Sequence, residues 1–198
     1  MNLEPNPRKT KDFRDLGAVD ITALREAVLA IPEEVWEAEN GAKPNRFGAL
    51  DQASHIIFRF VTNFDDWRSS ANHRLWPEWG PRLEPVLAQA VADYRYARGG
   101  FPRIMLARLP AGGVILPHVD ANPAAKWPHK IHVPLQTNER AMFFVNGVGR
   151  HIAEGEAVEV NNLGVHAVRN GGSTDRIHLI FEYYDMDQSP PSWAAAVA

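Results

Sequence analysis

The sequence of 198 residues contains no cysteine. Disulfide bonds, thiolate nucleophiles, zinc ribbons and iron–sulfur clusters are therefore excluded. Any metal that the chain binds must be held by histidine and carboxylate side chains.

A strong excess of either charge is also missing. The chain has 21 basic and 24 acidic residues, for a net charge of -3 with neutral histidines. This balance provides no bulk attraction to nucleic acid or to anionic lipid. We therefore expect no nucleic acid and no membrane as partners, whereas small neutral or charged partners and the oligomeric state are left open.

Long hydrophobic runs are absent too. No segment approaches the length of a membrane span, and the polar residues 1–11 lack the apolar core of a signal peptide. We therefore expect a cytoplasmic protein. A content of 45% hydrophobic and 23% charged residues is ordinary for a globular chain, and this length fits a single domain with a proper core.

The first part of the chain, residues 1–100, predicts an arm, helices and one strand. Residues 1–12 are polar and contain proline, which predicts an extended or loosely ordered arm. Apolar residues at helical spacing follow Asp20, a candidate helix cap, and Pro32 then ends this helix and begins a second one. The apolar residues of the first helix are Ile21, Leu24, Val28 and Ile31.

Four further segments complete this part. Residues 37–48 are loop-like, whereas the β-branched and aromatic residues 55–61 predict a strand. Residues 65–79 predict an irregular connector or one wall of a pocket. An apolar stripe over residues 83–94 predicts a supporting helix that ends at Gly99-Gly100.

From Phe101 onward the pattern is typical of β structure. Short apolar or alternating runs are separated by turn residues without intervening helices, which favours a sandwich or barrel. The predicted strands are Ile104–Leu109, Val114–Val119, Lys130–Gln136, Ala141–Val145, Ala157–Val160, Val165–Val168 and Ile177–Tyr184. We expect one structural domain that is mainly β, with its core at residues 101–187 and a tail at residues 188–198.

A possible metal site begins at His118-Val119-Asp120. Alternate side chains of a strand share a face, so His118 and Asp120 would point the same way. A second histidine from a distant strand would complete a set of two nitrogens and one oxygen, leaving positions for a co-substrate and dioxygen. Taken alone, the triplet is a weak signal, because a histidine on a strand is more often structural.

Arg176 strengthens this interpretation. It lies ten residues after His166, at the start of a predicted strand. A guanidinium that points into a barrel is costly unless a planar anion meets it, and a dicarboxylate can do so through a bidentate pair. The alternative is an arginine that caps the strand at the surface.

Together these residues resemble the aspartyl/asparaginyl β-hydroxylase group of iron(II)- and 2-oxoglutarate-dependent oxygenases. The similarity covers about residues 103 to 185. Its motifs are Pro117-His118-x-Asp120, His132-x-Pro134-Leu135, Glu154-Gly155-Glu156, Asn161-Asn162 before His166, Val168-x-Asn170 and Arg176-x-His178-Leu179.

The resemblance implies a double-stranded β-helix, also called a jelly roll or cupin-like fold. It further implies that His118, Asp120 and His166 bind Fe(II), and that Arg176 binds the distal carboxylate of 2-oxoglutarate, with O2 as the second co-substrate. We expect Lys130 and His132 near the keto-acid end of 2-oxoglutarate, although the family often has arginine where this chain has Lys130. The retained Asp120 favours hydroxylation over halogenation.

The other histidines are less informative. His178 shares its strand face with Arg176, so it either lines the co-substrate pocket or is a buried structural residue. We interpret the remaining ones as structural or exposed: His55, His73, His129 and His151. The loop at residues 121–129 is either a lid over the site or a plain connector.

The function expected from the resemblance is hydroxylation of a C–H bond, with release of succinate and CO2. The substrate would be an amino acid, a peptide or protein Asp/Asn side chain, or a peptide-like small molecule. Five residues are candidates for the substrate wall: Trp67, Arg68, Arg74, Trp76 and Trp79. For the three tryptophans, packing of the first part of the chain on the barrel is the preferred interpretation. The alternatives are a non-catalytic cupin-like module that binds a metal or an acidic ligand, and a metal-dependent hydrolase.

Overall fold

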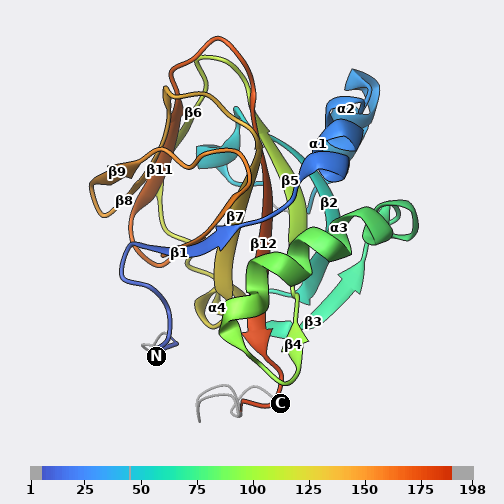
Figure 1. Cartoon of the computed structure of the whole chain (residues 1–198), viewed down its shortest axis with the longest axis vertical. Helices are drawn as coiled ribbons and strands as arrows, with labels where there is room; N and C mark the ends of the chain where they lie inside the picture. The colour runs from blue at the N-terminus through green and yellow to red at the C-terminus, as the bar shows by residue number, and fades with distance from the viewer. Residues whose placement is uncertain (1–5, 45, 189–198) are drawn as a thin grey trace.

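The protein is mainly β and is built from two antiparallel sheets (Figure 1). A computed structural model describes residues 6–44 and 46–188. The first residues of the predicted arm and nearly all of the predicted tail lie outside these ranges. In the described part, no helix combines the length and the apolar character needed to cross a bilayer.

Residues 6–12 have no regular secondary structure, as predicted, but they are not loose. Asn6 is buried, and its side-chain amide donates a hydrogen bond to the carbonyl of Trp127 (3.0 Å). Strand β1 (Phe13–Ala18) follows and pairs with β10 (Glu156–Val160). No strand is predicted there from the sequence, because the run is short and polar.

Two helices come next, and the second is longer than predicted. Helix α1 (Thr22–Leu29) lies within the predicted range, and Asp20 accepts a hydrogen bond from the Thr22 amide. Helix α2 (Glu33–Ala42) has Pro32 as its N-cap and two acids in its first turn. Its last turns replace the loop predicted at residues 37–48, because Trp36 is buried and anchors the helix despite Gly41.

The prediction of an irregular segment at residues 65–79 is wrong. Strand β2 (Ser54–Asn63) contains the predicted strand, and β3 (Asp66–Asn72) folds back against it. Helix α3 (Trp76–Val91) begins well before residue 83 and ends before Gly99-Gly100. Proline near its N-terminus obscured the start, although a helix tolerates proline in its first turn.

The strands predicted after residue 101 are all present, two with the predicted bounds and five with ends shifted by one or two residues. Gly99–Gly100 forms the short strand β4, which pairs with β12. The others are β5 (Ile104–Leu109), β6 (Val114–His118), β7 (His129–Gln136), β8 (Ala141–Val145), β9 (Val148–Arg150), β10, β11 (His166–Asn170) and β12 (Arg176–Asp185). Strand β9 is an addition: Asn146 and Gly147 have φ of 50° and 83° and make the tight turn from β8. Short helices α4 (Pro123–Lys126), η1 (Gly48–Leu50) and η2 (Ala92–Tyr94) lie in connections.

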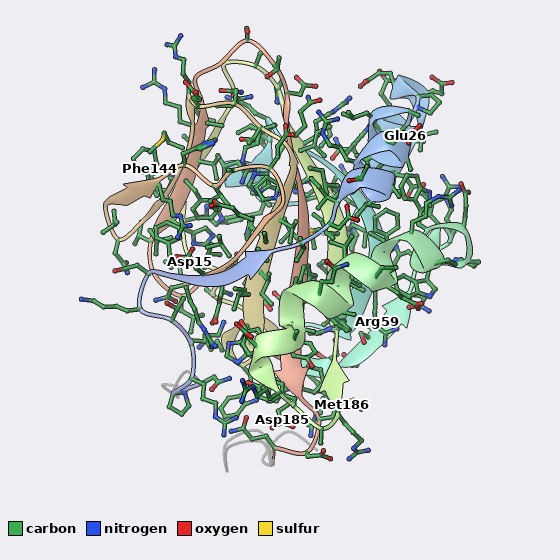
Figure 2. All side chains as sticks on the ribbon, viewed as in Figure 1. Asp15, Glu26, Arg59, Phe144, Asp185 and Met186 are labelled. Atoms are coloured by element: carbon green, nitrogen blue, oxygen red, sulfur yellow. The ribbon has the colours of Figure 1, made fainter. Side chains whose placement is uncertain are left out.

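The two sheets form the predicted jelly roll. The large sheet has the order β1-β10-β7-β12-β5-β2-β3, and the small one has the order β6-β11-β8-β9. Figure 1 shows the small sheet on one side of the molecule and α1, α2 and α3 on the other. In Figure 2, Phe144 of the small sheet and Glu26 of α1 mark these opposite sides.

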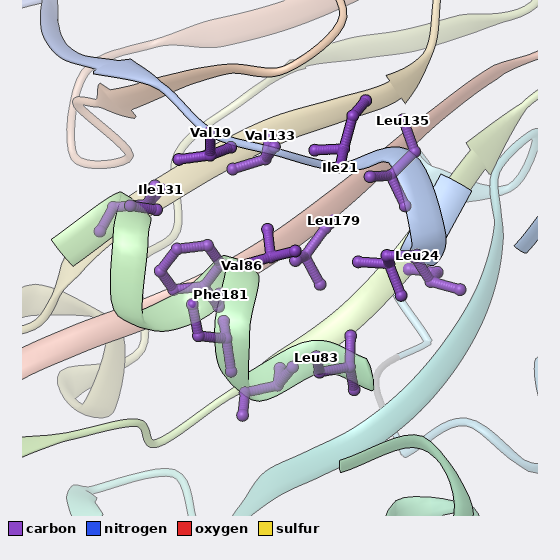
Figure 3. Close-up of a cluster of buried hydrophobic side chains, with 14 of the residues drawn as sticks. Val19, Ile21, Leu24, Leu83, Val86, Ile131, Val133, Leu135, Leu179 and Phe181 are labelled. Carbon is purple, nitrogen blue, oxygen red and sulfur yellow. The ribbon is translucent and has the colours of Figure 1, made fainter. Parts of the chain in front are cut away.

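Alternation along β7 and β12 decides what each face of the large sheet does. One face packs against the helices, and its β7 residues Ile131, Val133 and Leu135 are fully buried. Leu179 and Phe181 of β12 join them against α1 and α3 (Figure 3). Each such side chain contributes about 1.5–3 kcal/mol through burial. The opposite face of the same strands is free to carry polar groups toward the small sheet.

Candidate metal and co-substrate site

Three metal-ligating side chains meet at the ends of two paired strands. His118 ends β6 and His166 begins β11, and the two residues are direct cross-strand partners. The strand alternation used to place Asp120 does not extend to it, because β6 ends at His118. The amide of Asp120 donates to the Asn162 carbonyl (3.0 Å). One ligand atom from each of the three residues lies within 4.8 Å of the others.

Both imidazoles are oriented by backbone carbonyls. The Nδ1 atom of His118 is 2.7 Å from the Leu116 carbonyl, and that of His166 is 3.0 Å from the Gly164 carbonyl. A carbonyl only accepts, so each Nδ1 carries the proton and Nε2 keeps a free lone pair. Burial lowers the pKa of His166 to about 4, so its ring is neutral at physiological pH, as a metal ligand must be.

Asp120 is held as a carboxylate by its neighbours. Lys130 Nζ donates to its Oδ2 at 2.5 Å, and the Asn162 amide reaches the same oxygen at 3.3 Å. Burial disfavours the charged form, but Lys130 and the two imidazoles outweigh it and keep the pKa of Asp120 well below its usual range.

Asn162 is itself oriented by the N-terminal segment. Lys9 Nζ donates to the side-chain oxygen of Asn162 and to the Ala125 carbonyl (3.3 Å). An ammonium group only donates, so the amide nitrogen of Asn162 must point toward Asp120 and Ala125. Residues 6–9 thus take part in the environment of the metal-binding carboxylate, which no sequence motif indicated.

The donor set suits iron. Two imidazole nitrogens and one carboxylate oxygen, placed on one side of a metal, form the facial triad of non-haem Fe(II) oxygenases. Soft metal ions that prefer thiolate ligands are disfavoured because the chain has no cysteine. The residues present therefore fit an Fe(II) ion.

Arg176 is a buried cation without a carboxylate partner in the described part of the chain. It is 3% exposed, and its Nη2 contacts only the Nδ1 of His178 (2.9 Å). Its guanidinium also lies 5.9 Å from the ring centre of Phe143, and burial lowers the pKa of Arg176 to about 9. Such a burial is costly, and an external anion would relieve it.

His132 and His178 add polar atoms that have no partner. Both ring nitrogens of the buried His132 and the Nε2 of His178 have no hydrogen bond to any residue that the structure describes. Burial, with the nearby Arg176 guanidinium, lowers the pKa of both imidazoles well below the usual value. Buried polar groups are nearly always hydrogen-bonded, so these atoms mark a place for a polar ligand.

One pocket of about 510 Å³ joins these groups. All of the predicted site residues line it except His178, which is hydrogen-bonded to Arg176. They are His118, Asp120, Lys130, His132, His166 and Arg176. The loop at residues 121–129 forms part of the wall, and hydrogen bonds from Asn6, Lys9 and Asn162 to its carbonyls tie it down. Whether it opens as a lid stays a prediction.

The candidate substrate-wall residues lie elsewhere. Trp67 stacks on Trp127 at 5.9 Å, and Trp79 is buried against Phe58, so these two pack the structure. Arg74 pairs with Glu39. Arg68 and Trp76 line a different pocket, beside α3. For the three tryptophans, the interpretation as packing is the better one.

Two of the remaining histidines are buried in different surroundings. His55 is buried and lines the pocket, while His129 is buried in a hydrogen-bonded pair with Glu159 (2.8 Å). The pocket also contains residues that no prediction named: Arg46, Phe47, Phe60, Phe64, Arg103 and Glu182. Only Glu182 had a signal in the sequence, since it shares its strand face with Arg176 and His178.

Comparison with known proteins agrees with this geometry. The model of the family described as Aspartyl/Asparaginyl beta-hydroxylase matches residues 62–185. No curated protein sequence matches the chain.

Solved structures share the fold at low sequence identity. An oxidoreductase of the 2OG-Fe(II) oxygenase family from Burkholderia pseudomallei has a TM-score of 0.57 and 14% identity, covering 95% of this chain and 98% of that one. AviO1 from Streptomyces viridochromogenes has a TM-score of 0.54 and 16% identity, covering 90% and 92%. A viral collagen prolyl hydroxylase from Paramecium Bursaria Chlorella virus-1, solved with 2OG, has a TM-score of 0.52 and 12% identity, covering 87% and 95%.

Proposed function

The chain belongs to the aspartyl/asparaginyl β-hydroxylase family, whose members are Fe(II)- and 2-oxoglutarate-dependent dioxygenases. We propose the following roles for its site residues and the following class of substrate. The substrate is an amino acid, a peptide or protein Asp/Asn side chain, or a peptide-like small molecule. A C–H bond of this substrate is hydroxylated, and succinate and CO2 are released.

His118, Asp120 and His166 hold the iron in this proposal. The Nε2 atoms of the two histidines and the Oδ1 of Asp120 are the ligand atoms, because their other polar atoms are already hydrogen-bonded. When bound, Fe(II) with 2-oxoglutarate and O2 supplies the oxidant for C–H hydroxylation.

Arg176 binds the distal carboxylate of 2-oxoglutarate. The observation that carries this assignment is its buried guanidinium, which no acidic side chain of the described residues neutralises. A carboxylate can take a bidentate pair of hydrogen bonds from it, and His178 fixes the plane of the guanidinium.

Lys130 and His132 lie toward the keto-acid end of the co-substrate. Both line the pocket, and the two free ring nitrogens of His132 can donate to or accept from a bound acid. Lys130 also keeps the charge of Asp120 compensated through Oδ2. The apolar walls exclude water from the reacting groups.

The test is an anaerobic titration of the metal-free protein with Fe(II) and 2-oxoglutarate, followed by the visible charge-transfer band of the chelate. We expect a band in the wild type, no band in Asp120→Ala, and a band that needs far more 2-oxoglutarate in Arg176→Met. The control is Arg169→Gln, an exposed arginine on the same strand as His166, which should match the wild type. An iron-loaded wild type without a band would contradict the proposal and favour the non-catalytic binding module. A zinc-dependent hydrolase would be indifferent to 2-oxoglutarate.

A further inference from the structure

The mouth of the pocket is apolar and exposed. Among the described residues, eight large hydrophobic side chains are exposed, and three of them line this pocket. They are Phe47, Phe64 and Val119, with exposed fractions of 51%, 44% and 37%. A cluster of exposed apolar groups around a concave site gains free energy when an apolar ligand covers it.

This apolar surface reaches the metal ligands. The rings of Phe47 and His118 are 5.5 Å apart, in edge contact. The ring centres of Phe64 and Phe60 are 6.0 Å apart, and Phe60, Met105 and Ile180 belong to one apolar cluster that also lines the pocket. A substrate group that contacts Phe47 therefore lies beside the metal-binding triad.

The buried charged groups of the pocket are already occupied. Arg103 pairs with Glu182 at 2.5 Å, and Lys130 pairs with Asp120 at 2.5 Å. Arg176 is assigned to the co-substrate. The remaining basic residue that lines the pocket, Arg46, donates to the Gly41 carbonyl (2.6 Å) and keeps its charge, but it is exposed, and an ion pair with a substrate at an exposed position contributes little.

The buried histidines do not supply a positive charge either. Burial, with help from nearby cations, lowers the pKa of His55 to about 3 and that of His132 well below its usual value. An aspartyl side chain of a substrate would thus have to lose its hydration without finding a buried cation, which is costly. An asparaginyl amide would likewise lose its hydration at walls that are mostly apolar, although Asn122 and His55 also line them.

We propose that this site selects an amino acid or peptide segment with an aliphatic or aromatic side chain, which Phe47, Phe64 and Val119 hold beside the metal-binding triad. The proposal rests on the function proposed above and narrows its substrate class. A pocket of about 510 Å³ is within the range of small-molecule sites, so it can take one such side chain together with the co-substrate.

The first experiment separates the two proposals. The anaerobic complex of the wild type with Fe(II) and 2-oxoglutarate is titrated with the N-acetyl amides of leucine, phenylalanine, aspartate and asparagine and with a short acyl lipid. Binding is read from the change of the charge-transfer band, and hydroxylation in air is read from product mass. We expect the leucine or phenylalanine amide to bind at least about tenfold more tightly than the aspartate and asparagine amides.

A preference for the aspartate or asparagine amide, no preference, no binding, or binding of the acyl lipid alone would overturn the substrate class while leaving the band intact. Loss of the band itself would instead overturn the proposed function. The two failures are therefore distinguishable.

A pair of surface variants tests the location. Phe47→Ser should weaken binding of the apolar amide about tenfold and leave the 2-oxoglutarate titration unchanged. Val148→Ser is the matched control, because Val148 is equally exposed at 51% but lies on β9 outside the pocket. Equal effects of the two substitutions would contradict the assignment of Phe47.

Discussion

Two arginines lie buried in the same pocket, and they differ in whether an acidic side chain pairs with them. Arg103 is 5% exposed and Arg176 is 3% exposed. Arg103 donates to Glu182 (2.5 Å) and to Asn122 (3.0 Å), so the chain itself neutralises its charge. Arg176 has His178 as its hydrogen-bonding partner and no acidic partner in the described ranges.

The difference separates a structural charge from a ligand-binding one. A buried ion pair that is complete adds rigidity, and breaking it leaves an isolated charge. A buried cation that is incomplete costs stability until an anion arrives, which is the property a site for a dicarboxylate needs. The following predictions test this contrast.

The largest effect is expected for Arg103→Met. This substitution leaves Glu182 buried without its partner, so the free energy of unfolding should fall by about 3–5 kcal/mol. Denaturant unfolding of the metal-free protein measures it. The double variant Arg103→Met/Glu182→Gln should recover part of the loss. A single variant as stable as the wild type would show that the ion pair is not structural.

For Arg176→Met we expect the opposite result: ligand affinity should fall and stability should not. Stability should stay the same or rise, because the variant removes a buried charge that lacks an acidic partner. Affinity for 2-oxoglutarate should fall about 100-fold, since a charge-assisted bidentate pair is lost. Denaturant unfolding and the anaerobic titration give the two values. If Arg176→Met loses as much free energy of unfolding as Arg103→Met and still binds 2-oxoglutarate normally, then Arg176 is a structural charge and not a ligand-binding one.

Lys9 is an intermediate case, because its partners are an amide and a carbonyl. Lys9→Met frees the Asn162 amide to turn, so Fe(II) affinity should fall about tenfold with little change in stability. Fe(II) titration monitored by competition with a chelator measures the affinity. Lys11→Met, an exposed neighbour, is the control, and Lys9→Arg should restore part of the affinity. Equal affinities of Lys9→Met and the control would exclude this positioning role.

The smallest effect concerns a buried acid with a full set of partners. Glu159 accepts hydrogen bonds from His129, Tyr94 (2.7 Å) and the Thr10 amide (3.2 Å). Burial alone would raise the pKa of Glu159, but these bonds lower it below the ordinary glutamate value of 4.5. Because the folded pKa lies below the unfolded one, the stabilisation is present above about pH 4.5 and is lost as the pH falls through the folded pKa.

Glu159→Gln should therefore be less stable than the wild type by about 1–2 kcal/mol at pH 7, with a gap that narrows on acidification. Unfolding curves from pH 7 down to pH 3 measure this gap. The exposed Glu84→Gln serves as control. A gap that is independent of pH would contradict the assignment.

The sequence predicted what depends on local patterns. The strands after residue 101 and the spacing of His118 and Asp120 follow period-two alternation, and the helix from residue 20 follows from its apolar stripe. Strand β3 and the start of α3 were missed because their sequence is polar or rich in proline, and tertiary packing decides such segments.

The candidate site shows the same limit. Its metal ligands and Arg176 could be predicted from a motif, although their roles stay predictions. The pairing of Arg103 with Glu182, or of Lys9 with Asn162, depends on residues 79 and 153 positions apart in the chain. No local pattern reports such a contact.

The pairing of β1 with β10 sets an order of assembly. Phe13 lies opposite Val160, so the first strand can pair only after about a further three quarters of the chain has been synthesised. Such distant contacts form slowly and late. Lys9 and its contact with Asn162 arrive with this strand. We therefore expect a nascent chain to complete its jelly roll before it can hold iron firmly, which keeps a reactive metal away from partly folded protein.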